Sequence, residues 1–97
     1  MKVCIRIERN GGALAVFPGM YEGYGMVDCY AHVGQHCVAE WLYLRYETRP
    51  ASPEEAAPLL RELSQIGYKD LEIIKKLPTF RWMIKNNWKK ELVLNHG

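Results

Sequence analysis

The sequence predicts a small α+β domain, and three local patterns indicate this fold class. Residues 2–8 alternate between apolar and polar side chains, a period of two that is typical of a half-buried strand. Asn10-Gly11-Gly12 follows after Arg9 and favours a hairpin turn. Ser52-Pro53-Glu54-Glu55 is typical of a helix start, because Ser caps the helix, Pro takes its first position and Glu55 completes a capping box.

The N-terminal third of the chain is predicted to be β-structure. Three strands are expected, over residues 2–8, 13–17 and 26–33. The apolar side of the first strand carries Val3, Ile5 and Ile7, and its polar side carries Lys2, Arg6 and Glu8. Residues 18–25 contain three glycines and predict a loop.

Residues 37–46 fit two kinds of secondary structure. Val38, Trp41, Leu42 and Tyr46 have helical spacing, whereas Val38, Leu42 and Leu44 also suit a strand. We favour the helix and keep the strand as the alternative.

The C-terminal half predicts two helices with a strand between them. The first helix begins at Ser52 and ends at Gly67, and Pro58 is expected to kink its first turns or delay its start. Residues 71–77 form the strand, and residues 79–91 form the last helix. The buried side of that helix is predicted to carry Phe80, Met83, Ile84 and Trp88.

Together these elements predict one domain over residues 1–97. We expect an antiparallel or mixed sheet of three to five strands, with two or three helices packed on one face.

Composition points to a cytoplasmic protein without a membrane partner. No segment approaches the roughly 20 apolar residues of a membrane-spanning helix, and no apolar block of a signal peptide follows Lys2. The three cysteines are an odd number, which argues against a closed disulfide framework and predicts thiols.

Positive charge is concentrated towards the C-terminus. Residues 69–97 contain seven Lys and Arg against three Asp and Glu. Arg81, Lys85 and Lys89 are four residues apart and form one helical stripe beside Trp82, an arrangement that suits phosphate contacts and base stacking. The nucleic-acid-binding candidates are therefore Lys75, Lys76, Arg81, Trp82, Lys85 and Lys89. The alternatives are a solvated lysine-rich face and a dimer contact through Trp82.

A second group of chemically active side chains lies between Cys29 and Cys37. It includes His32 and His36, so four candidate metal ligands fall within nine residues. On a strand, however, Cys29 and His32 point to opposite faces, and the paired CxxC spacing of zinc sites is absent. We therefore predict no metal ion, no cofactor and no catalytic residue. A metal-binding or hydrolytic site around His32, His36 and Cys37 is kept as the alternative.

Two stretches of the sequence resemble a known group of proteins. Ala31-His32-Val33-Gly34-Gln35-His36 and Thr48-Arg49-Pro50-Ala51-Ser52-Pro53-Glu54-Glu55 are similar to the HVGQH…TRPA-x-PEE pattern of small uncharacterised bacterial proteins, some encoded near phage or plasmid genes. The resemblance runs from residue 26 to residue 77. It implies no activity and assigns no residue a role, but it draws attention to two polar loops. If these loops converge, His32, His36 and Arg49 would receive an anionic group.

The sequence thus favours a small non-enzymatic binding module that engages a nucleic acid or a protein partner through its basic C-terminal helix. A homodimer is also expected. The chain has three Trp, six Tyr and two Phe, more than a core of this size accommodates, so some rings are exposed or shared across an interface.

Overall fold

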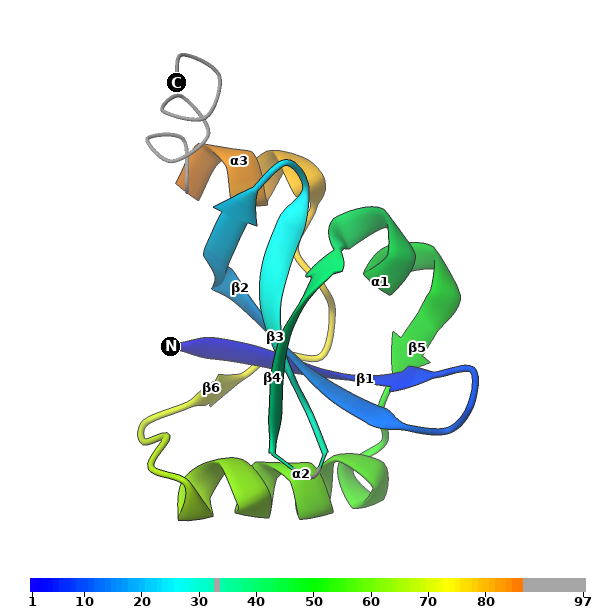
Figure 1. Ribbon diagram of the computed structural model, residues 1–97, viewed down its shortest axis with the longest axis vertical. Helices are drawn as coiled ribbons and strands as arrows, with labels where there is room; N and C mark the ends of the chain where they lie inside the picture. The colour runs from blue at the N-terminus through cyan, green and yellow to red at the C-terminus, as the bar shows by residue number, and fades with distance from the viewer. Residues whose placement is uncertain (33, 87–97) are drawn as a thin grey trace.

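In the computed structural model, which describes residues 1–32 and 34–86, six strands form one mixed sheet (Figure 1). The strand order is β4-β3-β2-β1-β5, with β6 also pairing with β1. The strands are β1 (Lys2–Glu8), β2 (Ala13–Gly23), β3 (Met26–Ala31), β4 (Gln35–Glu40), β5 (Thr48–Pro50) and β6 (Glu72–Ile73). The helices are α1 (Trp41–Glu47), α2 (Pro53–Gln65) and α3 (Phe80–Asn86).

The predicted α+β class is confirmed, and the described sheet has one strand more than the upper limit expected. The extra strand arises because β5 and β6 share one side of β1. Arg6–Glu8 pair antiparallel with β5, whereas Lys2 and Val3 pair parallel with β6. None of the helices in the described ranges is long and apolar enough to cross a bilayer.

The β1–β2 hairpin forms as predicted, but β2 continues beyond its expected end. Gly11 adopts φ +90° in the turn, which suits glycine, and Glu8 N–H donates to the Gly12 carbonyl at 2.8 Å. Residues 18–23, predicted to be loop, extend β2 to Gly23. The pairing with β3 shifts register between Val16 and Tyr21, and such an irregularity accommodates Pro18 within a strand.

Helices cover both faces of the sheet rather than the single face predicted (Figure 1). On one face, Trp41 and Leu44 of α1 and Met83 of α3 pack on Cys4, Leu14, Val16, Val27 and Cys29. On the other face, Ala56, Leu59 and Leu63 of α2 pack on Val3, Ile5, Ala15, Phe17 and Tyr30. Because successive strand residues point to opposite faces and both sets are apolar, each face requires its own cover.

The ambiguous stretch at residues 37–46 divides at Glu40. It is strand up to that residue and helix from Trp41, so the expected helix forms only in part. Trp41 and Leu44, three residues apart, are the buried side chains of α1, and this helical spacing fixes the division.

The start of α2 agrees with the prediction. Ser52 Oγ accepts from Glu55 N–H at 3.2 Å, Glu55 Oε1 accepts from Ser52 N–H at 2.9 Å, and the helix runs through Pro58 to Gln65. Gly67, at φ +112°, follows its C-terminal end. Of the strand predicted over residues 71–77, only β6 pairs, and of the helix predicted over residues 79–91, the described part is α3. Trp88 and Lys89 lie outside the described residues.

Candidate functional site

Arg6 is a buried cation of β1 that contacts the C-terminal end of α1 and lies beside the candidate site. The sequence placed it on the solvent side of β1, but α1 covers that face and leaves only 6% of the residue exposed. Its Nε donates to Thr48 Oγ1 at 2.9 Å, and its Nη2 donates to the carbonyls of Thr48 at 2.8 Å and Leu44 at 3.4 Å. A cation is favourable there, because the last carbonyls of a helix lack backbone partners. Arg6 therefore holds the end of α1.

Beside this anchor lies an open hollow of about 500 Å³, which we call the basic pocket. It is lined by Arg6, Arg45, Tyr46, Lys76, Leu77 and Thr79. Three of these residues are cationic and none is acidic. Within residues 1–32 and 34–86, neither Arg45 nor Lys76 has an ion-pair partner. The described part of the chain thus leaves these two positive charges uncompensated.

The positive charges at the basic pocket also repel one another. Burial lowers the pKa of the Arg6 guanidinium from its ordinary value, the Cys4 thiol acts in the opposite direction, and the charge of Arg45 lowers the pKa further. Arginine still remains protonated at neutral pH, because its ordinary pKa is far above that range. An anion at the pocket would relieve this repulsion.

The predicted nucleic-acid-binding residues are divided by the structure. Lys76 lines the basic pocket, and Lys75 precedes it on the same exposed segment. Arg81 and Lys85 are exposed four residues apart on α3, as the predicted stripe requires. Trp82, expected beside this stripe and off the apolar face, is instead half-buried against the cluster around Met83. The exposed ring on α3 is Phe80, with 44% of its surface accessible.

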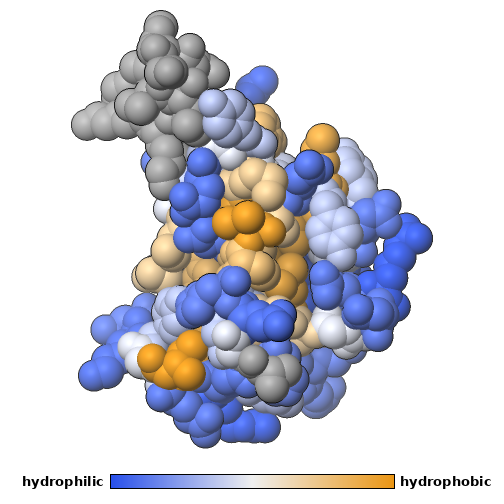
Figure 2. Space-filling model, viewed as in Figure 1, coloured by the Kyte–Doolittle hydropathy of each residue, from blue (hydrophilic) through white to orange (hydrophobic). Residues whose placement is uncertain are grey.

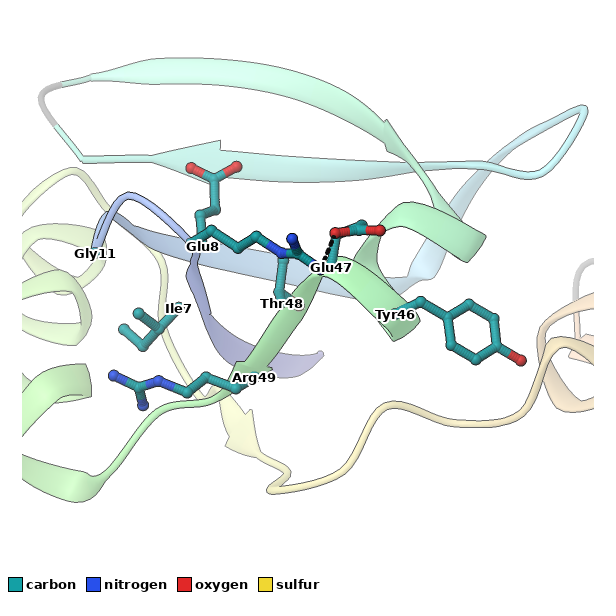
Figure 3. Close-up of a pocket in the computed structure, with 8 residues that line it drawn as sticks. Ile7, Glu8, Gly11, Tyr46, Glu47, Thr48 and Arg49 are labelled. Carbon is teal, nitrogen blue, oxygen red and sulfur yellow. Dashed lines mark ion pairs between the residues drawn. The ribbon is translucent and has the colours of Figure 1, made fainter.

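Tyr46 also lines a second open hollow, of about 390 Å³, formed by the end of β1, the β1–β2 turn, α1 and β5 (Figure 3). Its charged side chains have partners within the protein: Arg9 Nη2 forms an ion pair with Glu47 Oε2 at 2.7 Å, and Glu8 Oε1 accepts a hydrogen bond from the Tyr43 hydroxyl at 2.9 Å. In Figure 3, the side chains of Tyr46 and Arg49 point to different sides. This hollow is therefore less suited to an anion than the basic pocket.

The three residues of the predicted anion site have separate partners. Arg49 holds Glu55 through two contacts, Nη1–Oε1 at 2.8 Å and Nη2–Oε2 at 2.6 Å. His32 Nδ1 lies 2.9 Å from Glu62 Oε1, also on α2. The His36 ring packs edge-on against Tyr30, with centroids 5.0 Å apart, and lies near Tyr68. These contacts connect the β3–β4 segment and β5 to the α2 side of the sheet, and each of the three side chains has a partner of its own.

The residues of the alternative metal or hydrolytic site are brought together only in part, because His36 and Cys37 line one open hollow of about 330 Å³ and His32 does not. Cys37 pairs with Cys29 across β3 and β4, so it lies on the face covered by α1 and α3, whereas neighbouring His36 lies on the α2 face. Burial raises the pKa of the Cys29 thiol, and Cys37 raises it further. In the part of the chain that the structure describes, no three His, Cys, Asp or Glu side chains form a potential metal site.

Five of the six residues that line the basic pocket were not among the predicted site residues, and three of these five, Arg6, Arg45 and Tyr46, lie far from Lys76 in the sequence. No local signal marks them, because their proximity to Lys76 depends on α1 folding back over β1 and on the segment after β6 running beside it. A comparison of the chain with known protein families, with curated proteins and with solved structures found no match, so the site is interpreted from its own geometry.

Proposed function

We propose that this protein is a small non-enzymatic module that binds single-stranded nucleic acid at the basic pocket. The observation that carries the proposal is the set of three cations, Arg6, Arg45 and Lys76, around one hollow that no acidic residue lines. Phosphate oxygens accept strong hydrogen bonds from guanidinium and ammonium groups, and the release of counterions adds to the affinity.

Exposed aromatic rings next to these cations favour a single strand as the ligand. Tyr46 lines the pocket with 70% of its surface accessible, and Phe80 follows the pocket residue Thr79. Unpaired bases stack on such rings, whereas bases inside a duplex are already stacked on one another. Arg81 and Lys85 on α3 extend the positive surface along which a phosphate backbone would continue.

The first experiment is a fluorescence-anisotropy titration with short labelled single-stranded oligonucleotides at several salt concentrations. For single strands, each phosphate contact contributes about 0.7 to the slope of log affinity against log salt. Arg45→Glu/Lys76→Glu should therefore abolish binding, or reduce this slope by about 1.4 if two contacts are lost.

The matched control is Arg61→Glu/Lys69→Glu, which changes the net charge equally. Arg61 is exposed on α2, at the opposite face of the sheet, and Lys69 is exposed after that helix. This control should keep most of the affinity. Absence of binding at low salt, or equal weakening by both double variants, would contradict the proposal.

A second variant tests the stacking ring. Tyr46→Ala should lose about 1–3 kcal/mol of binding free energy, the contribution of one base stacked on an aromatic side chain. Tyr24→Ala is the control, because Tyr24 is equally exposed, at 72%, but lies in the turn between β2 and β3.

A further inference from the structure

β4 is an edge strand whose outer side lacks a partner among the described residues. It ends the strand order, and all its residues except the half-buried Ala39 are exposed. In Figure 1, β4 crosses in front of the other strands. An exposed edge presents backbone N–H and C=O groups that can pair with another strand.

The register of the β3–β4 ladder shows which backbone groups are free. Trp41 N–H donates to the Gly25 carbonyl at 2.8 Å, and the pairing continues without a shift from Met26–Glu40 to Ala31–Gln35. Along an antiparallel strand, the backbone N–H and C=O groups of one residue bond to the neighbouring strand, and those of the next residue point away from it. The N–H and C=O groups of His36, Val38 and Glu40 therefore point outwards.

This edge lacks several of the usual features that prevent association, and its one acidic residue is Glu40. β4 contains no Lys, no Pro and no bulge. Figure 2 has the viewpoint of Figure 1 and shows an apolar surface running through the centre of the molecule, with hydrophilic residues on both sides. Val38, half exposed, lies between two open hollows of about 330 Å³ and about 430 Å³, and together with Cys37 it lines both of them.

We infer that a second copy of this chain adds its own β4 here, antiparallel and with the two Val38 residues opposite each other on the two-fold axis. In this register the outward-pointing groups of both strands meet, and His36 of each copy lies opposite Glu40 of the other. An imidazole opposite a carboxylate is a favourable cross-strand pair, and the two-fold symmetry produces this pair twice. A two-fold axis through Glu40 would instead place the carboxylates of the two Glu40 residues opposite each other. The result is one continuous sheet across two copies.

The dimer is independent of the proposed nucleic-acid binding. No residue of β4 lines the basic pocket, so both pockets stay open in the dimer. A failure of either proposal therefore leaves the other intact.

Disulfide trapping tests the register. With Val38 on the axis, Cys37 lies opposite Ala39 of the second copy in a pair whose side chains are close. Ala39→Cys should give covalent dimers when oxidised glutathione takes up the electrons of the two thiols and is itself reduced to glutathione. Ala39→Cys/Cys37→Ser should not, because the introduced thiol then faces a hydroxyl group instead of the native thiol. Rapid trapping of the wild type through Cys37 alone would place the axis at Cys37 and overturn the register.

Sedimentation velocity over a range of concentrations tests the dimer itself. The wild type should shift from monomer to dimer as its concentration rises, and Val38→Lys should remain monomeric because two ammonium groups would meet on the axis. Val38→Pro should also remain monomeric, since it removes an outward N–H that β3 does not use. Leu42→Lys, a similar change at an exposed position of α1, should dimerise like the wild type. A wild type that stays monomeric at every concentration, or a Val38→Lys variant that dimerises unchanged, would overturn the inference.

Discussion

Arg49 on β5 donates to both carboxylate oxygens of Glu55 at the start of α2, with distances of 2.8 Å and 2.6 Å. The same carboxylate accepts from Ser52 N–H, so one acidic side chain joins the capping box to the edge of the sheet. Arg49 was predicted to receive an external anion, and the structure provides it with an internal one.

The Arg49–Glu55 contact predicts a specific dependence of stability on pH. The Arg49 guanidinium, followed by the backbone N–H of Ser52, lowers the pKa of Glu55 from 4.5 to about 2. A carboxyl group whose pKa is lower in the folded state stabilises the fold above the unfolded-state value, and this contribution is lost as the pH falls through the folded-state value. Arg49→Ala should therefore lower the free energy of unfolding at neutral pH, and its difference from the wild type should shrink between pH 4.5 and about pH 2.

Urea unfolding at a series of pH values measures this difference. Arg61→Ala is the control, because Arg61 is exposed on the same helix and has no ion pair within the described ranges. A difference between Arg49→Ala and the wild type that does not change with pH would show that the contact does not stabilise the fold through the charge of Glu55.

The Ser52 cap gives a second prediction. Ser52→Ala removes the acceptor for Glu55 N–H and leaves that donor without its side-chain partner. N-cap substitutions of this kind cost about 1 kcal/mol, within a range of about 0.5–2 kcal/mol. Ser64→Ala, an exposed position in the last turn of the same helix, should cost much less. Equal midpoints of chemical unfolding for the two variants would contradict the role of the cap.

The packing of α3 gives a third prediction. Met83 is fully buried, whereas Phe80 is 44% exposed. Met83→Ala should destabilise the protein by about 2–5 kcal/mol, because it removes a side chain and leaves a cavity. Phe80→Ala should have a clearly smaller effect on thermal unfolding. If Phe80→Ala proved the more destabilising, the helix would present the face that the sequence predicted.

Local signals made much of the fold predictable from the sequence. The turn at Gly11 and the cap at Ser52 depend on neighbouring residues only, and both appear as expected. The division between strand and helix at Glu40 was not predictable, because the apolar residues that follow satisfy both periods. The position of this boundary depends on the packing of Trp41 and Leu44 against one face of the sheet.

The candidate site was less predictable for the same reason. Lys76 was among the predicted residues because a cluster of positive charge can be recognised in the sequence. Arg45 and Tyr46 lie beside Lys76 only because the tertiary fold brings α1 next to the segment after β6. The burial of Trp82 also depends on which side of α3 packs against the sheet. The spacing of apolar residues in this segment did not identify that side.

The last prediction concerns the three thiols. Cys4 and Cys29 are buried, whereas Cys37 is exposed on β4. Burial raises the pKa of both Cys4 and Cys29, so neither thiol readily forms the reactive thiolate. Partial burial also raises the pKa of Cys37, while a hydrogen bond with Cys29 acts in the opposite direction. In dilute native protein, a thiol-specific reagent should therefore modify Cys37 alone, at a rate that increases with pH.

Mass spectrometry of the modified protein distinguishes the three positions. Cys37→Ser should remove the reaction in the native state, and Cys4 and Cys29 should react only after unfolding in denaturant. Modification of Cys29 at the rate of Cys37 would show that the edge formed by β3 and β4 opens in solution. The accessibility of Cys37 would then reflect local unfolding rather than its position on the outer strand.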